Sequence, residues 1–126
     1  MGIFNTLLGN ATNTNPVEVE NQILDVLYNG EEVMYAFSYV RDLIVFTTGR
    51  IIFIDKQGVT GKKKEFQSIP YKNISRFSIE TSGHFDEDSE IKIWVSGMAE
   101  PIVREFSGDK NIIDVQKLIA QVACSR

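Results

Sequence analysis

The sequence predicts a mainly β domain in which seven short antiparallel strands bend around one core and a C-terminal helix closes the open end. Two patterns predict this class. Short apolar runs, separated by Gly, Pro and polar turn residues, recur from about residue 32 to 106. Apolar residues then recur at helical spacing over about residues 109–123, where Asp109 is a suitable cap.

A helix is also expected before the first strand. Asn15 is a suitable N-cap, Pro16 suits the first helical position, and Glu18 lies three residues after the cap. Apolar residues at helical spacing continue to Asn29-Gly30, so this helix is predicted over about residues 16–28. The polar residues 10–15 are predicted to be a linker, which divides the chain into an N-terminal arm (1–14) and one domain (15–126).

The seven strands are placed by apolar runs and by the turn residues between them. Thr48-Gly49 makes a tight turn, and the two glycines of residues 57–61 make the next one. The strands are expected at residues 32–40, 43–47, 50–55, 63–69, 77–81, 91–95 and 102–106.

Composition narrows the possible functions. The 126 residues suit one globular domain, 43% of them are apolar and 24% are charged. The net charge of -4 argues against nucleic acid as a partner, because binding to the phosphate backbone needs a concentrated positive field. No apolar run reaches the roughly 20 residues that span a bilayer. A single cysteine, Cys124, fits a reducing compartment, so the expected location is the cytoplasm.

No residue pattern predicts catalysis, a cofactor or a metal. The one histidine, His84, lies in an acidic turn, whereas a zinc site usually needs three or four well-spaced ligands. Only His84 and Cys124 could form a nucleophile–base pair, and Cys124 is two residues from the chain end, where a helix frays. We therefore expect no catalytic residue, no cofactor and no metal site, and we interpret the turn around His84 as solvated.

The run Lys62-Lys63-Lys64 is the clearest candidate for binding an anion or a lipid headgroup, with Arg41 as a further contact. In a strand, however, Lys63 points opposite to its two neighbours, which splits the charge between two faces. Lysines also commonly protect an edge strand from aggregation. The structural role is the favoured interpretation, and membrane binding is the alternative.

Surplus apolar residues point to a second covered face. In the second and third strands both faces are apolar, and one face fills the barrel while the other needs a cover. The helix over residues 16–28 could cover it, and so could a second copy of the chain. Trp94 shares an outward face with Lys92 and Ser96, which is typical of an interface anchor. The residues predicted for an interface between copies are Trp94, Ile44, Phe46, Ile52 and Ile54.

Several stretches of the chain resemble the bacterial pleckstrin homology (PH) domain family. They are Arg41–Thr47, Arg50–Lys63, Ser68–Tyr71, Phe77–Asp86 and Ile91–Gly97, in the same order as in the family. The resemblance implies a seven-stranded PH-like barrel closed by a helix, in a stand-alone bacterial cytoplasmic protein that forms ring-shaped homo-oligomers. Lipid-binding members of the wider superfamily carry several basic residues between the first two strands, but here that loop is Val40-Arg41-Asp42. Phosphoinositide binding by that route is therefore disfavoured.

Together these observations predict a non-catalytic PH-like module that assembles with itself and offers a surface to a protein partner. Peripheral binding of an anionic lipid or a small anion through Lys62, Lys63 and Lys64 is the alternative. The resemblance favours assembly over an intrachain cover for the surplus apolar face.

Overall fold

A computed structural model of the 126-residue chain describes residues 11–39, 42–81, 88–107 and 111–124. Eight strands, two α-helices and two short 3-10 turns make up this part of the chain. In order they are β1 (Thr12–Thr14), α2 (Pro16–Gln22), η1 (Leu24–Val26), β2 (Val33–Tyr39), β3 (Asp42–Thr47), β4 (Arg50–Gln57), β5 (Lys63–Pro70), η2 (Tyr71–Asn73), β6 (Ile74–Thr81), β7 (Ser89–Val95), β8 (Ile102–Phe106) and α3 (Asn111–Ala123).

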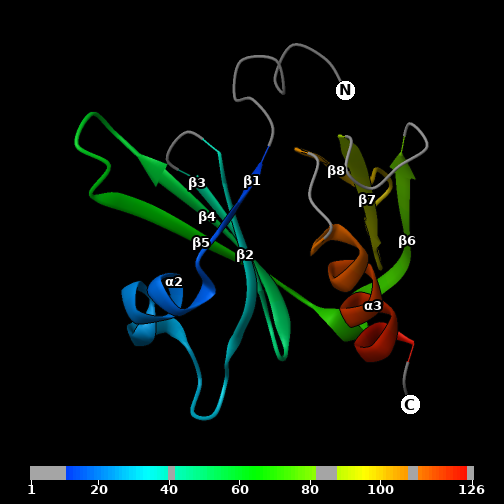
Figure 1. Ribbon diagram of the computed structural model, residues 1–126, viewed down its shortest axis with the longest axis horizontal. Coiled ribbons are helices and arrows are strands. Elements are labelled where there is room, and N and C mark those ends of the chain that lie inside the picture. The colour runs from blue at the N-terminus through cyan, green and yellow to red at the C-terminus, as the bar shows by residue number, and fades with distance from the viewer. Residues whose placement is uncertain (1–10, 40–41, 82–87, 108–110, 125–126) are drawn as a thin grey trace.

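The strands form two antiparallel sheets that lie on opposite sides of the molecule (Figure 1). One has five strands in the order β1-β2-β3-β4-β5, and the other has three in the order β6-β7-β8. A bridge between Ala11 and Phe106 joins β8 to the residue that precedes β1. The helix α3 lies beside the smaller sheet and closes one end of the space between the sheets (Figure 1).

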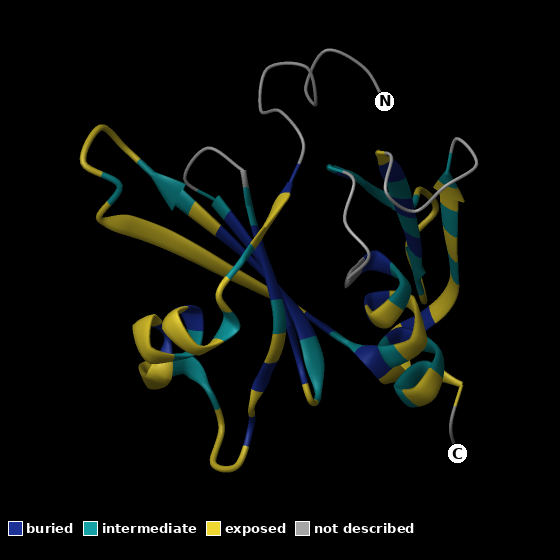
Figure 2. Ribbon diagram, in the orientation of Figure 1, coloured by how far each residue is buried: buried dark blue, intermediate teal, exposed yellow. Residues whose placement is uncertain are grey.

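Two hydrophobic cores lie on the two faces of the larger sheet. The main core lies between the sheets, where the ring of Phe37 meets those of Phe46 and Phe106 edge-on. The helix α3 adds Ile112, Val115 and Ile119 to this core, each with at most 1% of its surface exposed. Figure 2 shows the buried inner strands of the larger sheet between more exposed elements.

The second core lies between the larger sheet and the N-terminal helical segment. Val19 of α2 and Ile23 pack against residues of the outer face of the sheet, namely Val33, Ala36, Leu43, Val45, Ile52 and Ile54. The cap of α2 is the predicted one, because the Oδ1 atom of Asn15 accepts hydrogen bonds from the backbone N–H groups of Val17 (2.9 Å) and Glu18 (3.4 Å). The surplus apolar face is thus covered by the chain's own helix.

The predicted mainly β architecture, with an N-terminal helix and a closing C-terminal helix, is confirmed with three local differences. The sheets do not close into a complete barrel, because β1 has only three residues and the bridge at Ala11 is isolated. Residues 12–14, predicted as linker, form a strand that pairs with β2. The first helix ends at Gln22 rather than near residue 28, since Ile23 leaves the helical conformation (φ -120°, ψ 24°) and a 3-10 turn follows. The predicted cap Asp109 lies outside the described residues.

Candidate functional site

Trp94 lies on the outer face of the three-stranded sheet, as the alternation of β7 predicted. Its neighbours in the chain, Ile93 and Val95, belong to or pack on the main core, whereas Trp94 is half-buried and paired across the sheet with Arg76. The guanidinium carbon of Arg76 lies 3.9 Å from the centroid of the Trp94 ring, which is a cation–π contact. Part of the indole surface is therefore covered by Arg76, and the rest faces outward.

The four other predicted interface residues lie inside the single chain. Ile44 and Phe46 are 1% exposed and belong to the main core, while Ile52 and Ile54 are 0% and 2% exposed and lie under α2. The register pairs Ile44 with Phe53 and Val45 with Ile52, so the two pairs of residues point to opposite faces of the sheet. This corrects the grouping of the four on one outward face, because the prediction lacked the pairing register. No exposed surface of these side chains is left for a second copy.

Two of the three predicted lysines, Lys63 and Lys64, begin β5, and the third, Lys62, immediately precedes it at the end of the β4–β5 turn. All three are exposed, and Lys56 on β4 is the cross-strand partner of Lys64. The turn itself is made by Gly58 (φ 78°) and Gly61 (φ 70°), and it presents Val59 fully to solvent. The structure therefore brings the lysine run together with a fourth lysine and an apolar tip. The other predicted contact, Arg41, lies outside the described residues.

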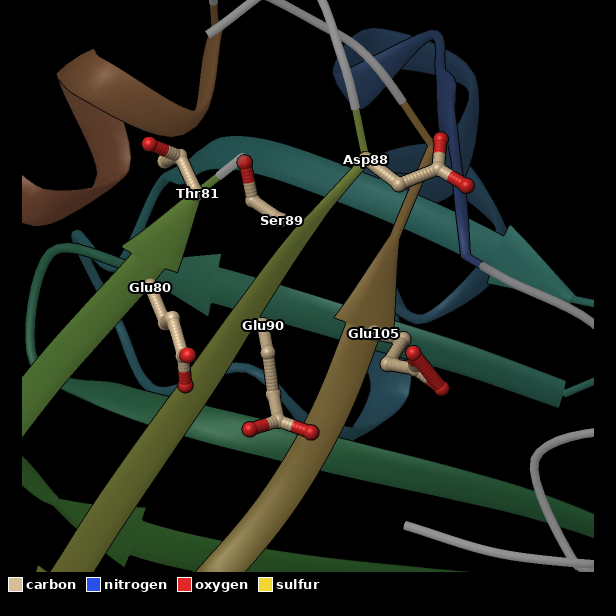
Figure 3. Close-up of a pocket in the computed structure, with 6 residues that line it drawn as sticks. All are labelled: Glu80, Thr81, Asp88, Ser89, Glu90 and Glu105. Atoms are coloured by element: carbon tan, nitrogen blue, oxygen red, sulfur yellow. The ribbon is translucent and has the colours of Figure 1, made fainter. Parts of the chain in front are cut away.

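A row of carboxylates crosses the outer face of the smaller sheet (Figure 3). The register places Glu90 of β7 between Glu80 of β6 and Glu105 of β8. The three side chains line a shallow hollow of about 300 Å³ together with Thr81, Asp88 and Ser89. The Nζ atom of Lys92 lies 3.8 Å from Glu90, which offsets part of the negative charge. The sequence shows an acidic turn here, but the alignment of three strands is visible only in the fold.

In the described part of the chain, no residues are arranged as a metal site or as a nucleophile–base pair. Among its His, Cys, Asp and Glu side chains, no group of three is placed to hold a metal ion. Cys124 is exposed with a free thiol, and His84 lies outside the described residues, as do Asp86 and Glu87 of the same turn. None of the described helices is long and apolar enough to cross a membrane.

A buried ion pair between Glu31 and Arg50 was not predicted. Glu31 is 5% exposed and also accepts hydrogen bonds from the Thr47 hydroxyl and the backbone N–H of Tyr28. Burial raises the pKa of Glu31, but the hydrogen bonds from Arg50, Thr47 and Tyr28 outweigh burial and leave that pKa below its ordinary value. The hydrogen bond with Glu31 raises the pKa of Arg50. The pair has a structural role, since Arg50 also donates a hydrogen bond to the carbonyl of Val26 in the 3-10 turn η1 and thereby ties η1 to the β3–β4 hairpin.

Sequence and structural similarity identify the family of the chain. The family described as "Bacterial PH domain" matches residues 2–123. The chain is 55% identical to YjqA, an uncharacterized protein of Bacillus subtilis strain 168, over 97% of this chain and 98% of that protein. It is 30% identical to YozO, another uncharacterized protein of the same strain, over 99% of this chain and 100% of that protein. No enzymatic family is indicated by these matches.

Crystal structures with the same fold come from two Shewanella species. A DUF1696 family protein with a pleckstrin-homology domain, from Shewanella loihica PV-4, has a TM-score of 0.79 and 42% identity, over 91% of this chain and 98% of that one. A pleckstrin homology domain from Shewanella amazonensis SB2B has a TM-score of 0.68 and 45% identity, over 97% and 98% of the two chains. The resemblance stated from sequence is thereby confirmed, and the chain belongs to the bacterial PH domain family.

Proposed function

We propose that this protein is a non-catalytic cytoplasmic module that self-assembles into a ring-shaped homo-oligomer and serves as a scaffold for a protein partner. The observation that carries the proposal is that β5 is an exposed strand at the edge of its sheet. This strand is the last of the five-stranded sheet, so it pairs with β4 on one side only. Residues 63–68 are exposed on both faces, and Phe66 has 38% of its surface exposed.

An edge strand of this kind is a template for association. Its outward backbone N–H and C=O groups are available to pair with another strand. A parallel, in-register pairing of two β5 strands is disfavoured, because it would place Lys63 and Lys64 of one copy beside the same lysines of the other. A contact between β5 of one copy and a different surface of the next copy avoids this repulsion. Such a head-to-tail contact generates a ring when its rotation closes.

The outer face of the smaller sheet suits contact with the exposed side chains of β5, because the backbone of this face is already paired within its own sheet. It carries the carboxylate row of Glu80, Glu90 and Glu105, opposite in charge to the lysines at the start of β5. The same face carries Trp94, an aromatic residue of the type that concentrates binding energy at interfaces. Trp94 is the one predicted interface residue that remains outward, so the proposal rests on Trp94 and β5 rather than on Ile44, Phe46, Ile52 or Ile54.

Light-scattering mass after size exclusion tests the assembly. The wild type is expected at several times the chain mass of 14.2 kDa. Trp94→Glu and Phe66→Glu should each lower the mass, because each introduces a charge into the proposed contact. Val59→Glu is the matched control, since Val59 is fully exposed at a turn and lies outside that contact. A monomeric wild type at micromolar concentration would refute the assembly.

A second function, peripheral binding to an anionic membrane surface, is favoured by the β4–β5 hairpin. Lys56, Lys62, Lys63 and Lys64 flank a turn whose tip, Val59, is fully exposed. Neither ion pair of the described residues includes these lysines. Several lysines near an anionic surface contribute on the order of 1 kcal/mol each, and an apolar tip adds contact with the interface.

Co-sedimentation with vesicles tests this second function separately. Vesicles with and without anionic lipid are compared at low and high salt for the wild type and for the variant with Lys62, Lys63 and Lys64 all changed to Glu. Salt-sensitive pelleting that the triple variant loses would support membrane binding. Lys72→Glu is a control for an exposed lysine elsewhere on the chain. Equal pelleting with neutral and anionic vesicles would contradict it.

A further inference from the structure

The strand β5 is the most open of the sheet edges that the structure describes. The opposite edge of the larger sheet is β1, which has only three residues. In the smaller sheet, β6 contacts α3 and pairs irregularly with β7, and the bridge from Ala11 to Phe106 occupies part of the edge of β8. By contrast, the eight residues of β5 pair with β4 in one unbroken register, and residues 63–68 are exposed (Figure 2).

The register shows which backbone groups of β5 point away from β4. Hydrogen-bonded and unbonded residue pairs alternate along an antiparallel ladder. The backbone N–H of Tyr71 donates to the carbonyl of Gly49 (3.4 Å), and these two residues continue the register of β4 with β5. The next residue, Pro70, is therefore in an unbonded pair, which suits a residue that lacks an N–H group.

Every second residue of β5 before Pro70 is likewise unbonded to β4. The backbone N–H and C=O groups of Lys64, Phe66 and Ser68 therefore point outward from the sheet. Their side chains lie on the face that α2 covers, because Phe66 pairs with Ile54 and Ser68 with Ile52. This edge offers a row of backbone donors and acceptors beside an ammonium group and a partly exposed aromatic ring.

The charges beside this edge favour an acidic partner strand. Lys62, Lys63 and Lys64 are exposed, and Lys56 is the cross-strand neighbour of Lys64. Edge lysines repel a strand that carries basic residues and attract one that carries carboxylates at the opposite positions. Glu65 ends the basic run, so the partner residue opposite it should be neutral or basic.

We propose that β5 binds an extended acidic segment of the protein partner as an added antiparallel strand. The proposal rests on the proposed scaffold function, although it does not need the ring. From its N-terminal side, the segment places an apolar residue opposite Phe66, a neutral or basic residue opposite Glu65, and acidic residues opposite Lys64 and Lys63. Backbone hydrogen bonds supply the affinity, and the paired side chains supply the specificity.

Calorimetric titration with a blocked heptapeptide tests the proposal. Its sequence, Thr-Thr-Val-Thr-Glu-Glu-Thr, places valine opposite Phe66 and the two glutamates opposite Lys64 and Lys63. A counterpart with lysines in place of the glutamates should bind at least about fivefold more weakly, because attractive cross-strand pairs become repulsive. Equal affinity for the two peptides would overturn the proposal.

The titration is made on the wild type and on Trp94→Glu, because the lysines of β5 are also assigned to the contact between copies. Trp94→Glu alters that contact and leaves β5 unchanged, so it should bind the glutamate peptide at least as tightly as the wild type does. If neither protein binds this peptide at millimolar concentration, the proposal is overturned, even for a wild type that forms a ring. Binding by a wild type that scatters as a monomer would support the edge site while refuting the ring.

N-methylation of the peptide tests the backbone pairing. Methyl groups on the nitrogens of the valine and the first glutamate remove the N–H groups that face Phe66 and Lys64, so affinity should fall at least about tenfold. The matched control carries the methyl groups on the threonine between them and on the second glutamate, whose N–H groups face away from β5. Equal losses from the two patterns would overturn the added-strand geometry.

A charge swap tests the protein side of the contact. The variant with Lys63 and Lys64 both changed to Glu should prefer the lysine peptide over the glutamate peptide, which a merely damaged strand would not do. Lys72→Glu, at an exposed lysine of η2, should keep the preference of the wild type. An unchanged preference in the charge-swapped variant would overturn the proposal.

Hydrogen exchange resolved to single amides identifies the occupant of the edge. Without peptide, the amides of Lys64 and Phe66 should exchange faster than those of Glu65 and Gln67, which bond to β4. The glutamate peptide should slow the two outward amides. Outward amides that are protected in the wild type without peptide, but not in Trp94→Glu, would show that a second copy occupies the edge and would overturn the proposal.

Discussion

Glu31 and Arg50 are 19 positions apart and form a two-pronged ion pair, with Arg50 Nε 2.9 Å from one carboxylate oxygen and a terminal nitrogen 3.0 Å from the other. The same guanidinium donates to the carbonyl of Val26 (2.7 Å) and to the hydroxyl of Ser68 (2.8 Å). One side chain thus holds together the end of the N-terminal helical segment, the start of β4 and the edge strand β5. The contacts are stronger than a surface ion pair because the Glu31 carboxylate is fully buried.

Glu31→Gln should lower the free energy of unfolding by roughly 2–4 kcal/mol, because it leaves the partly buried Arg50 without a counter-charge. Urea denaturation followed by circular dichroism at neutral pH measures this. Glu32→Gln is the control, since Glu32 is the neighbouring carboxylate and is exposed. Equal losses in the two variants would contradict a special role for the buried pair.

The pair should also make stability depend on pH. The pKa of Glu31 is below its ordinary value of 4.5 in the folded protein, so its contribution is complete above about pH 4.5 and is lost as the pH falls through the lowered pKa. The difference in unfolding free energy between the wild type and Glu31→Gln is therefore expected to be constant down to about pH 4.5 and to shrink over the acidic range below it. A difference that stays constant over this range would show that the charge of Glu31 is not what stabilises the fold.

Ile54→Ala should destabilise the chain by about 2–4 kcal/mol without changing its mass in solution. Ile54 is 2% exposed and packs under the N-terminal helical segment, so its loss leaves a cavity within one chain. Urea denaturation and light scattering are measured on the same samples. Phe66→Ala, at an exposed edge position, should have little effect on stability. A drop in mass for Ile54→Ala would return this residue to the interface between copies.

Asn15→Ala should lower stability by about 1 kcal/mol, because two backbone N–H groups of α2 lose their acceptor. Asn15→Ser should restore most of this loss, since serine caps helices about as well as asparagine. Thermal unfolding of the three proteins under one condition measures the difference. If serine were no better than alanine, the side chain of Asn15 would act through some contact other than the cap.

How far the sequence predicts the fold depends on how local the signal is. The cap at Asn15 and the helical spacing of the apolar residues in α3 depend only on residues within one or two helical turns. Both predictions were confirmed. The short strand Thr12–Thr14 was predicted as linker because its residues are polar, and it is a strand only because β2 lies beside it. The early end of α2 at Gln22 likewise depends on packing that the helical period does not show.

In the candidate sites, too, the predictions that depended on local patterns succeeded, and those that depended on packing between elements did not. The outward position of Trp94 followed from alternation along β7 alone. The pairing of Glu31 with Arg50 carried no local signal, because the two residues lie in separate elements.

The sequence by itself determined the order of the two helices and of the seven strands β2 to β8, the PH-like family and the surplus of apolar residues on β3 and β4. These properties depend on residue type and on the spacing of apolar residues over short stretches, both of which can be read directly from the sequence. Only the tertiary structure decided that α2 covers Ile52 and Ile54 and that Ile44 and Phe46 face the other way. The physical reason is register: a shift of one residue in strand pairing moves every side chain to the opposite face, and pairing over long sequence separations is fixed only when the sheets pack.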